Sequence, residues 1–176
     1  MTNCNNQISE DEAYEEARKC AHRIIKAREK TSHDLLKRLQ EKSHGRKMSE
    51  KVVERFIEVG LVDDERFSEI YIRSAQYSGK GWQRIVRELQ QKGIDTQCLE
   101  PPLDEEELER ANQVIARFAI ETYKDRQKLL RKLVTRGYSY GIAKQAIAAK
   151  VSESGEGDGQ PLPENFGSTS SFEVTF

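Results

Sequence analysis

A five-residue phrase that occurs three times constrains the fold of this chain more than any other feature. The phrase is Leu-x-x-(Lys/Arg)-(Gly/Ser), and it occupies residues 39–43, 89–93 and 133–137. A helix-capping residue flanked by apolar residues precedes each copy by 26 to 30 positions. Helix signals that recur every 40–50 residues or so predict small helical units stacked side by side. Such arrays form extended binding surfaces more readily than enclosed catalytic pockets.

The repeat predicts an all-α fold, an elongated, curved array of three tandem three-helix units. The expected boundaries are 9–61, 62–102 and 103–151 for the repeats, with a flexible N-terminus at 1–8 and a disordered acidic tail at 152–176. Pro101 and Pro102 should reduce the third helix of the middle repeat to little more than a turn. Capping residues predict where the other helices begin. The predicted N-caps are Ser9 (in a capping box with Glu12), Ser49, Asp63, Asp104 and Ser139.

Composition limits the size of the core and separates the charges along the chain. Only 36% of the residues are hydrophobic and 34% are charged, so each unit buries a thin core, which argues against a compact enzyme with a deep active site. Residues 152–176 contain five acids and no Lys or Arg. The remainder has 29 basic and 25 acidic residues, a net charge of +4, and residues 18–55 hold thirteen Lys or Arg against five acids.

The cysteines and the apolar pattern indicate a cellular setting. Three cysteines without a short pairing, Cys4, Cys20 and Cys98, favour a reducing compartment over a disulfide scaffold. The sequence has neither a secretory apolar segment at its start nor a run long enough to span a bilayer. We therefore expect a cytoplasmic protein with no membrane association.

Basic residues recur on the second helix of each repeat. Between residues 124 and 150 there are eight Lys or Arg and one acid, whereas a merely solvated face would mix in more glutamates. This pattern favours contact with phosphates over a solvated face. The candidate binding residues are Arg73, Lys80, Trp82, Arg84, Arg87, Lys92, Lys128, Arg131, Lys132 and Arg136.

Aromatic residues near these cations allow two interpretations. Trp82, the only tryptophan, lies between Lys80 and Arg84 and could pack between two units, stack on a base or dock in a protein partner. Tyr138 and Tyr140 allow the same two kinds of role, and packing is favoured for all three.

No grouping predicts catalysis, a cofactor or a metal. Residues 78–80, Ser-Gly-Lys, lack the earlier glycine and the preceding strand of a phosphate-binding loop. His22, His33 and His44 are spaced eleven apart, too far for a helical metal pair. A non-enzymatic binding protein is therefore the first hypothesis, and an undetected enzyme is the last.

Residues 60–74 and 79–94 of the middle repeat are similar to two signatures of the RecX family of bacterial recombination regulators. Residues 60–74, Gly-Leu-Val-Asp-Asp-Glu-Arg-Phe-Ser-Glu-Ile-Tyr-Ile-Arg-Ser, are similar to that family's Gly-(Leu/Tyr)-Leu-Asp-Asp-x-Arg-Phe-Ala-x-x-(Tyr/Phe)-(Val/Ile)-x-Ser signature. Residues 79–94 resemble its Gly-x-Gly-x-x-Arg-Ile-x-x-Glu-Leu-x-x-Lys-Gly-Ile signature. The chain departs from the family at Trp82, where proline is common, and at the shortened helix before Pro101.

The resemblance implies a monomeric, non-enzymatic protein that lies in the groove of the RecA–DNA filament. It implies inhibition of ATP hydrolysis, filament extension and strand exchange, and through these an influence on recombination, DNA repair and the SOS response. Single-stranded DNA should be a weak, nonspecific and salt-dependent second partner. The alternative is a stand-alone helical protein that binds nucleic acid nonspecifically. The acidic tail has no counterpart in the resemblance.

Overall fold

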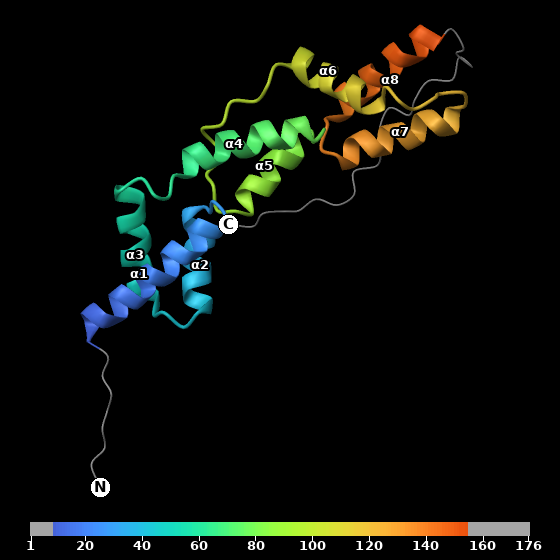
Figure 1. The fold of residues 1–176 in the computed structure, drawn as a ribbon. Coiled ribbons are helices and arrows are strands. Elements are labelled where there is room, and N and C mark those ends of the chain that lie inside the picture. Colours follow the sequence, from blue (N-terminus) through green and yellow to red (C-terminus); the bar gives the residue numbers. More distant parts are fainter. Residues whose placement is uncertain (1–8, 155–176) are drawn as a thin grey trace, which may run out of the picture. The chain divides into compact units, whose positions relative to one another are not determined.

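The computed structural model describes residues 9–154 of the 176, and every regular element in this range is helical (Figure 1). Between residues 9 and 154 there is no strand, so the all-α prediction is confirmed. The predicted flexible N-terminus lies outside the described residues, and so does the acidic tail beyond residue 154. The helices are α1 (Glu10–Ala27), α2 (Ser32–Glu41), α3 (Arg46–Glu58), α4 (Asp64–Tyr77), α5 (Trp82–Gln90), α6 (Asp104–Ile115), α7 (Tyr123–Thr135) and α8 (Tyr140–Ser154).

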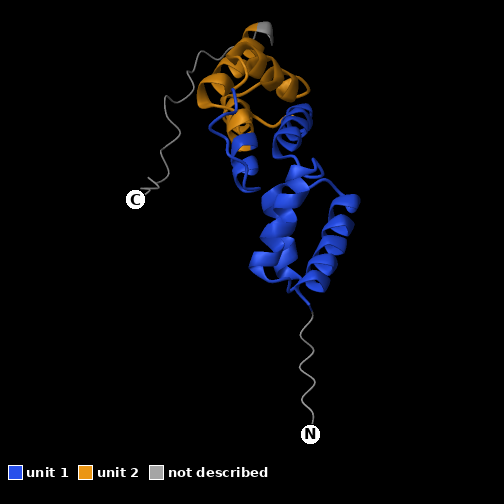
Figure 2. Cartoon of the chain, turned by 90° about the vertical axis from the view of Figure 1, so that its left-hand side faces the viewer, with its two compact units in different colours: residues 1–78, 85–100 blue, residues 79–84, 101–176 orange. Residues whose placement is uncertain are grey.

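The described residues group into two compact units (Figure 2). Unit 1 contains the residues up to 78 together with residues 85–100, and unit 2 contains residues 79–84 and those from 101 onward. Unit 1 therefore holds α1 to α4 and most of α5, whereas α6, α7, α8 and the first turn of α5 belong to unit 2. The three repeat boundaries and the curved array stay predictions.

The repeated phrase is a helix-terminating motif in all three copies. Its last residue has a positive φ each time, 66° at Ser43, 77° at Gly93 and 94° at Gly137. The next amide donates back to the carbonyl of the leucine that opens the phrase, at 3.3, 3.2 and 3.1 Å respectively. The amide of the last residue itself donates three residues back, at 2.9 to 3.0 Å. These two hydrogen bonds define the Schellman motif, which explains why glycine ends two of the copies.

Most of the predicted N-caps are confirmed, and two are wrong. Ser9 forms its capping box with Glu12, Asp63 accepts from the Arg66 amide, and Ser139 accepts from the Ile142 amide at 3.2 Å. Ser49 lies inside α3, fully buried, because α3 begins at Arg46 after Gly45. Its hydroxyl donates to the His44 carbonyl at 3.2 Å instead.

The second incorrect cap is Asp104, which is the first residue of α6. Leu103 stands at the N-cap and makes no side-chain cap. Asp104 and the three glutamates after it fill the first turn, where negative charge stabilises the helix dipole. Before α6, residues 91–103 contain no helix, as the two prolines predicted.

Each unit buries its own apolar cluster. In unit 1, α1, α2 and α3 pack against one another, with Leu35, Leu39 and Val52 fully buried among them. In unit 2, α8 packs against α6 and α7 and buries Ile115, Leu133 and Tyr138 completely. The exposed side of α7 is thereby fixed, since its apolar side faces this core.

The N-terminus of α2 is held by two other segments of unit 1. Asp64 accepts hydrogen bonds from the Ser32 amide at 2.8 Å and the Ser32 hydroxyl at 2.5 Å. The Thr31 hydroxyl donates to the Lys92 carbonyl at 2.9 Å and accepts from the Asp34 amide at 3.1 Å. The two adjacent acids of the signature therefore act differently: Asp63 caps its own helix, and Asp64 caps another.

We expect Asp64→Ala to destabilise the protein more than Asp63→Ala. Loss of the Asp63 cap should lower the free energy of unfolding by about 1 kcal/mol. Loss of Asp64 removes two hydrogen bonds to a carboxylate and leaves the Ser32 amide without its partner, for about 2–3 kcal/mol. Urea melts of the two variants against the unsubstituted protein give both values. Equal losses would contradict the long-range role of Asp64.

Candidate functional site

Two segments that are far apart in sequence join backbone to backbone in unit 2. The Gly81 amide donates to the Arg136 carbonyl at 2.9 Å, and the Gln83 amide donates to the Gly137 carbonyl at 3.1 Å. We call residues 79–84 and 136–138 the glycine junction. It brings the end of α7 against the start of α5, which sequence reasoning placed in different repeats.

The glycine junction has no room for side chains at its centre. A Cβ atom added to Gly81 would lie 2.3 Å from the Tyr138 backbone nitrogen. One added to Gly137 would lie 2.3 Å from Arg84 Cβ, and the φ of Gly137 is also positive. These are backbone or near-backbone atoms that cannot rotate away, so glycine is required at both positions.

A buried carboxylate caps α5 within the same unit. Glu107 of α6 is only 7% exposed, and its Oε1 accepts a hydrogen bond from the Trp82 amide at 2.8 Å. A carboxylate at this end of a helix satisfies an amide and stabilises the helix dipole. The N-terminus of α5 is therefore already bound to an anion of the protein itself.

The side of α7 that faces away from the core of unit 2 carries a row of basic residues. Lys128, Lys132 and Arg136 follow one another at four-residue spacing, which places them on one helix face. Arg117, from the connection between α6 and α7, joins them through a shared aromatic ring. The Lys132 Nζ lies 3.7 Å from the Phe118 ring centroid, and Arg117 Cζ lies 5.1 Å from it. We call Arg117, Lys128, Lys132 and Arg136 the cation cluster.

The electrostatics of the cation cluster favour an anionic ligand. Partial desolvation, and then the charges of Arg117, Arg136 and Lys128, lower the pKa of Lys132 below its usual range. Like charges that repel one another at close range raise the free energy of the unbound protein. A bound phosphate or carboxylate would relieve this repulsion, which is the arrangement expected of a polyanion-binding surface.

Arg136 connects the cation cluster to the glycine junction. Its carbonyl accepts a hydrogen bond from the Gly81 amide, and its Nη1 donates a hydrogen bond to the Gly79 carbonyl at 3.2 Å. Lys80, Trp82 and Arg84 lie in the junction and are partly buried. Arg131 lies exposed on α7 between Lys128 and Lys132. Unit 2 thus contains seven of the ten predicted binding residues.

The other three predicted residues lie in unit 1. Arg73 on α4 and Arg87 on α5 are exposed. Lys92 is engaged inside the unit, where its Nζ lies 3.6 Å from Asp34 Oδ2 and within 6.0 Å of the Phe67 and Tyr71 ring centroids. A lysine held by these contacts is less accessible to a partner than Arg73 or Arg87.

The structure decides between packing and binding roles for two aromatic residues. Tyr138 is fully buried in the core of unit 2, and Tyr140 packs against the same core, so the packing interpretation is confirmed for both. Burial raises the pKa of the Tyr138 phenol. Trp82 opens α5 with its backbone amide bonded to Glu107 and its side chain partly buried.

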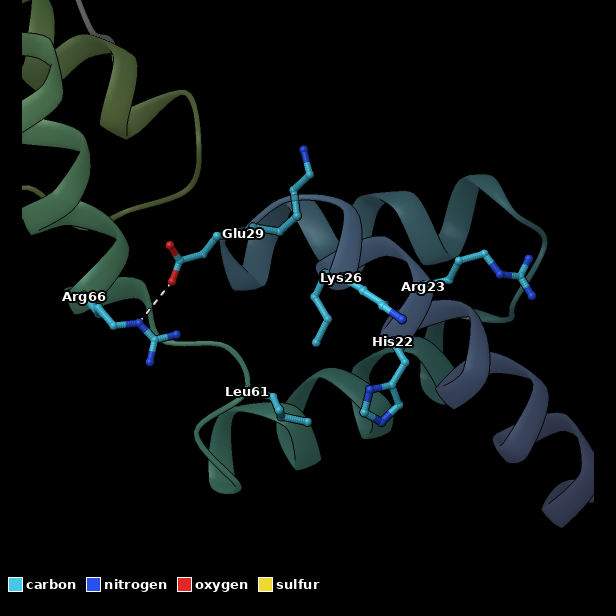
Figure 3. A pocket seen from close by; sticks show the side chains of 8 residues that line it. His22, Arg23, Lys26, Glu29, Leu61 and Arg66 are labelled. Carbon is cyan, nitrogen blue, oxygen red and sulfur yellow. Dashed lines mark hydrogen bonds and ion pairs between the residues drawn. The ribbon is translucent and has the colours of Figure 1, made fainter.

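Sequence reasoning missed a basic groove of about 610 Å³ in unit 1 (Figure 3). It lies along the second half of α1, with Leu61 and Arg66 opposite, and Arg66 pairs with Glu29 at 3.0 Å. Arg23, Lys26 and Lys30 supply further positive charge. Desolvation, followed by the charge of Arg38, lowers the pKa of Lys30. The only sequence signal was the excess of basic residues between 18 and 55.

The described residues hold neither a metal-binding group nor a membrane-spanning helix. No group of three or more His, Cys, Asp or Glu side chains within residues 9–154 is arranged to hold a metal ion. None of the helices in that range is both long and apolar enough to cross a membrane.

The described residues form an all-helical protein with basic surfaces in each unit, and comparisons with known proteins identify its family. The chain belongs to the RecX family. Residues 63–100 match the family model described as the second three-helix domain of RecX. The regulatory protein RecX of Halorhodospira halophila is 32% identical over 144 residues, which cover 78% of this chain and 89% of that protein. That of Streptomyces coelicolor is 31% identical over 153 residues, 81% of each chain.

Solved structures agree on the fold. The crystal structure of RecX from Lactobacillus salivarius superposes with a TM-score of 0.69 at 20% identity, covering 79% of this chain and 97% of that one. A second crystal structure of regulatory protein RecX gives a TM-score of 0.65 at 21% identity, covering 77% and 72%. The relatives are regulatory proteins by name, so this chain belongs to a family of regulators.

Proposed function

We propose that this protein is a non-enzymatic regulator that binds the RecA recombinase filament on DNA. It acts in the cytoplasm as a monomer and inhibits ATP hydrolysis, filament extension and strand exchange. Through these effects it modulates homologous recombination, DNA repair and the SOS response. The observation that carries the proposal is the cation cluster of unit 2 on a member of the RecX family.

The composition of the cation cluster supports a partner that presents a row of negative charges. Lys128 and Lys132 of α7 and its C-cap residue Arg136 repeat at one-turn spacing, which suits a linear polyanion or an acidic protein groove. Of the residues that read adenine in a DNA groove, α7 contains no Asn and one Gln, Gln127, so contact with phosphates without base selection is expected.

Free nucleic acid is the alternative partner, because the same cations would also bind DNA that carries no recombinase. We expect this binding to be weak and strongly dependent on salt. If about four phosphates are neutralised on a single strand, affinity should fall roughly fiftyfold between 50 and 200 mM salt. Fluorescence anisotropy with an oligo-dT strand measures this slope. A duplex sequence bound far more tightly than random DNA at physiological salt would contradict nonspecific phosphate contact.

The test of the proposed function is recombinase ATPase activity on single-stranded DNA, titrated with this protein. Inhibition should saturate at protein concentrations well below those that coat free DNA. A parallel titration with excess bare DNA separates the two hypotheses, because a stand-alone DNA binder would inhibit only by occupying the strand. Unchanged ATPase activity at all concentrations would rule out the regulator.

A further inference from the structure

The acidic tail and the cation cluster have opposite charges, and the tail follows α8 of unit 2 in the sequence. Residues 152–176 contain five acids and no basic residue. The cation cluster combines Arg117 and Lys132, which lie against the Phe118 ring, with Lys128 and Arg136, whose charges act on Lys132. We infer that the acidic tail binds the cation cluster and competes there with the polyanionic partner. The competition rests on the proposed function, but the contact between tail and cluster does not.

The end of α8 lies beside the connection that supplies one side of the cluster. Lys150 Nζ, in the last turns of α8, donates to the Ile115 carbonyl at 2.9 Å and to the Ala116 carbonyl at 2.6 Å. Arg117 and Phe118 follow these two residues directly. The chain therefore leaves α8 close to Arg117, and the tail begins next to the surface that we assign to it.

The tail is long enough to reach every member of the cluster. The thirteen residues of α7 extend over roughly 20 Å, at 1.5 Å per residue. Ten residues of extended chain span roughly 33 Å, so less than half of the tail passes the whole of α7. Acids are spread along the tail at Glu153, Glu156, Asp158, Glu164 and Glu173, so several can face the cluster at once.

Tethering makes a weak contact effective. A segment attached by a short linker has an effective concentration of about 1 mM, so an intrinsic Kd of about 0.1–0.5 mM leaves the cluster covered for roughly two thirds to nine tenths of the time. A nucleic acid or filament that offers many phosphates displaces the tail, whereas an isolated small anion competes poorly. The tail would thus raise the threshold for binding and reduce nonspecific contact with free DNA.

Lysine acetylation followed by mass spectrometry tests the contact without recombinase or DNA. The variant is the full chain with its tail acids neutralised by Glu153→Gln, Glu156→Gln, Asp158→Asn, Glu164→Gln and Glu173→Gln. At low salt, Lys128 and Lys132 should be acetylated about three- to tenfold faster in this variant than in the unsubstituted protein. Lys19 and Lys47 of unit 1 should keep their rates. Equal rates at Lys128 and Lys132 in the two proteins would overturn the inference.

A matched control separates a local contact from a change in total charge. Exposed acids of unit 1 are neutralised in the full chain by Glu16→Gln, Glu41→Gln, Glu54→Gln, Glu69→Gln and Glu100→Gln, which changes the net charge by the same amount. The rates at Lys128 and Lys132 should not change. An increase equal to that of the tail variant would also overturn the inference, because it would trace the effect to net charge.

Binding to an oligo-dT strand then measures the competition. The tail variant should bind about three- to tenfold more tightly at 50 mM salt, and the difference should shrink at 500 mM as charges are screened. A tail variant with unchanged DNA affinity would refute the competition. If the unsubstituted protein and the tail variant both fail to inhibit recombinase ATPase, the proposed function is refuted. The acetylation rates would still decide whether the tail covers the cluster.

Discussion

Lys128→Glu combined with Arg131→Glu is expected to abolish inhibition of recombinase ATPase while the protein keeps its helical content and melting temperature. Both side chains are exposed on α7, on the side away from the buried Leu129, Leu130 and Leu133. Substitutions at exposed positions change the free energy of unfolding by about 0.5 kcal/mol or less. At a polyanionic partner, each reversal replaces an attraction by a repulsion, so the affinity should fall by at least about thirtyfold, ~2 kcal/mol.

The matched control reverses two exposed lysines of unit 1, Lys37→Glu and Lys47→Glu, which changes the net charge equally. This control should inhibit like the unsubstituted protein. Circular dichroism and a thermal melt establish that each variant is folded before the ATPase titration. A folded Lys128/Arg131 variant that inhibits at full strength would show that the exposed side of α7 is only solvated. The basic groove of unit 1 would then be the next candidate for the binding surface.

Gly81→Ala is expected to be the most damaging single substitution in unit 2. The added methyl group would meet the backbone of Gly137 and Tyr138 at 2.3 to 2.5 Å, so the two segments must separate. Separation breaks the hydrogen bonds from the Gly81 and Gln83 amides, and it withdraws the Trp82 amide from the buried Glu107 carboxylate. Overpacking together with unsatisfied amides should lower the free energy of unfolding by about 3–5 kcal/mol.

Trp82 fluorescence reports this loss directly, since Trp82 is the only tryptophan and lies in the glycine junction. The control is Gly141→Ala in α8, where an added Cβ would have no neighbour within 4 Å. Alanine forms helix more readily than glycine, so this substitution should stabilise the protein by about 0.5–1 kcal/mol. A Gly81→Ala variant with the same melting temperature as the unsubstituted protein would contradict the close approach of the two backbone segments at the glycine junction.

Local signals in the sequence predicted much of the fold. The Leu-x-x-(Lys/Arg)-(Gly/Ser) phrase predicted a helical repeat, and it recurs at three helix ends because its hydrogen bonds close within six residues. Ser9 and Asp63 predicted helix starts for the same reason. The prediction of Ser49 as an N-cap was wrong because a serine hydroxyl can also donate back to a carbonyl from inside a helix. Gly45 occupies the N-cap of α3 instead.

The arrangement of the candidate site depended on contacts that no local signal encodes. Nothing adjacent to Glu107 marks it as the cap of a helix that begins 25 residues earlier. Arg117 was missed because it lies after the end of α6, and no local signal places it beside Lys132 at the Phe118 ring. The residue types that bind phosphate could be predicted from sequence, but their grouping by unit required the structure.

The two hydrogen bonds that hold Arg136 have a consequence for how fast and how tightly a partner can bind. An arginine on a free surface samples many rotamers, and ordering it on binding typically costs about 0.5–1.5 kcal/mol of entropy. The backbone of Arg136 is fixed by the Gly81 amide, and its guanidinium by the Gly79 carbonyl. Much of that ordering is therefore complete when the chain folds. For the polyanionic partner proposed above, a guanidinium held in this way is an anchor that needs little further ordering, whereas the exposed Lys128 must still be ordered on contact.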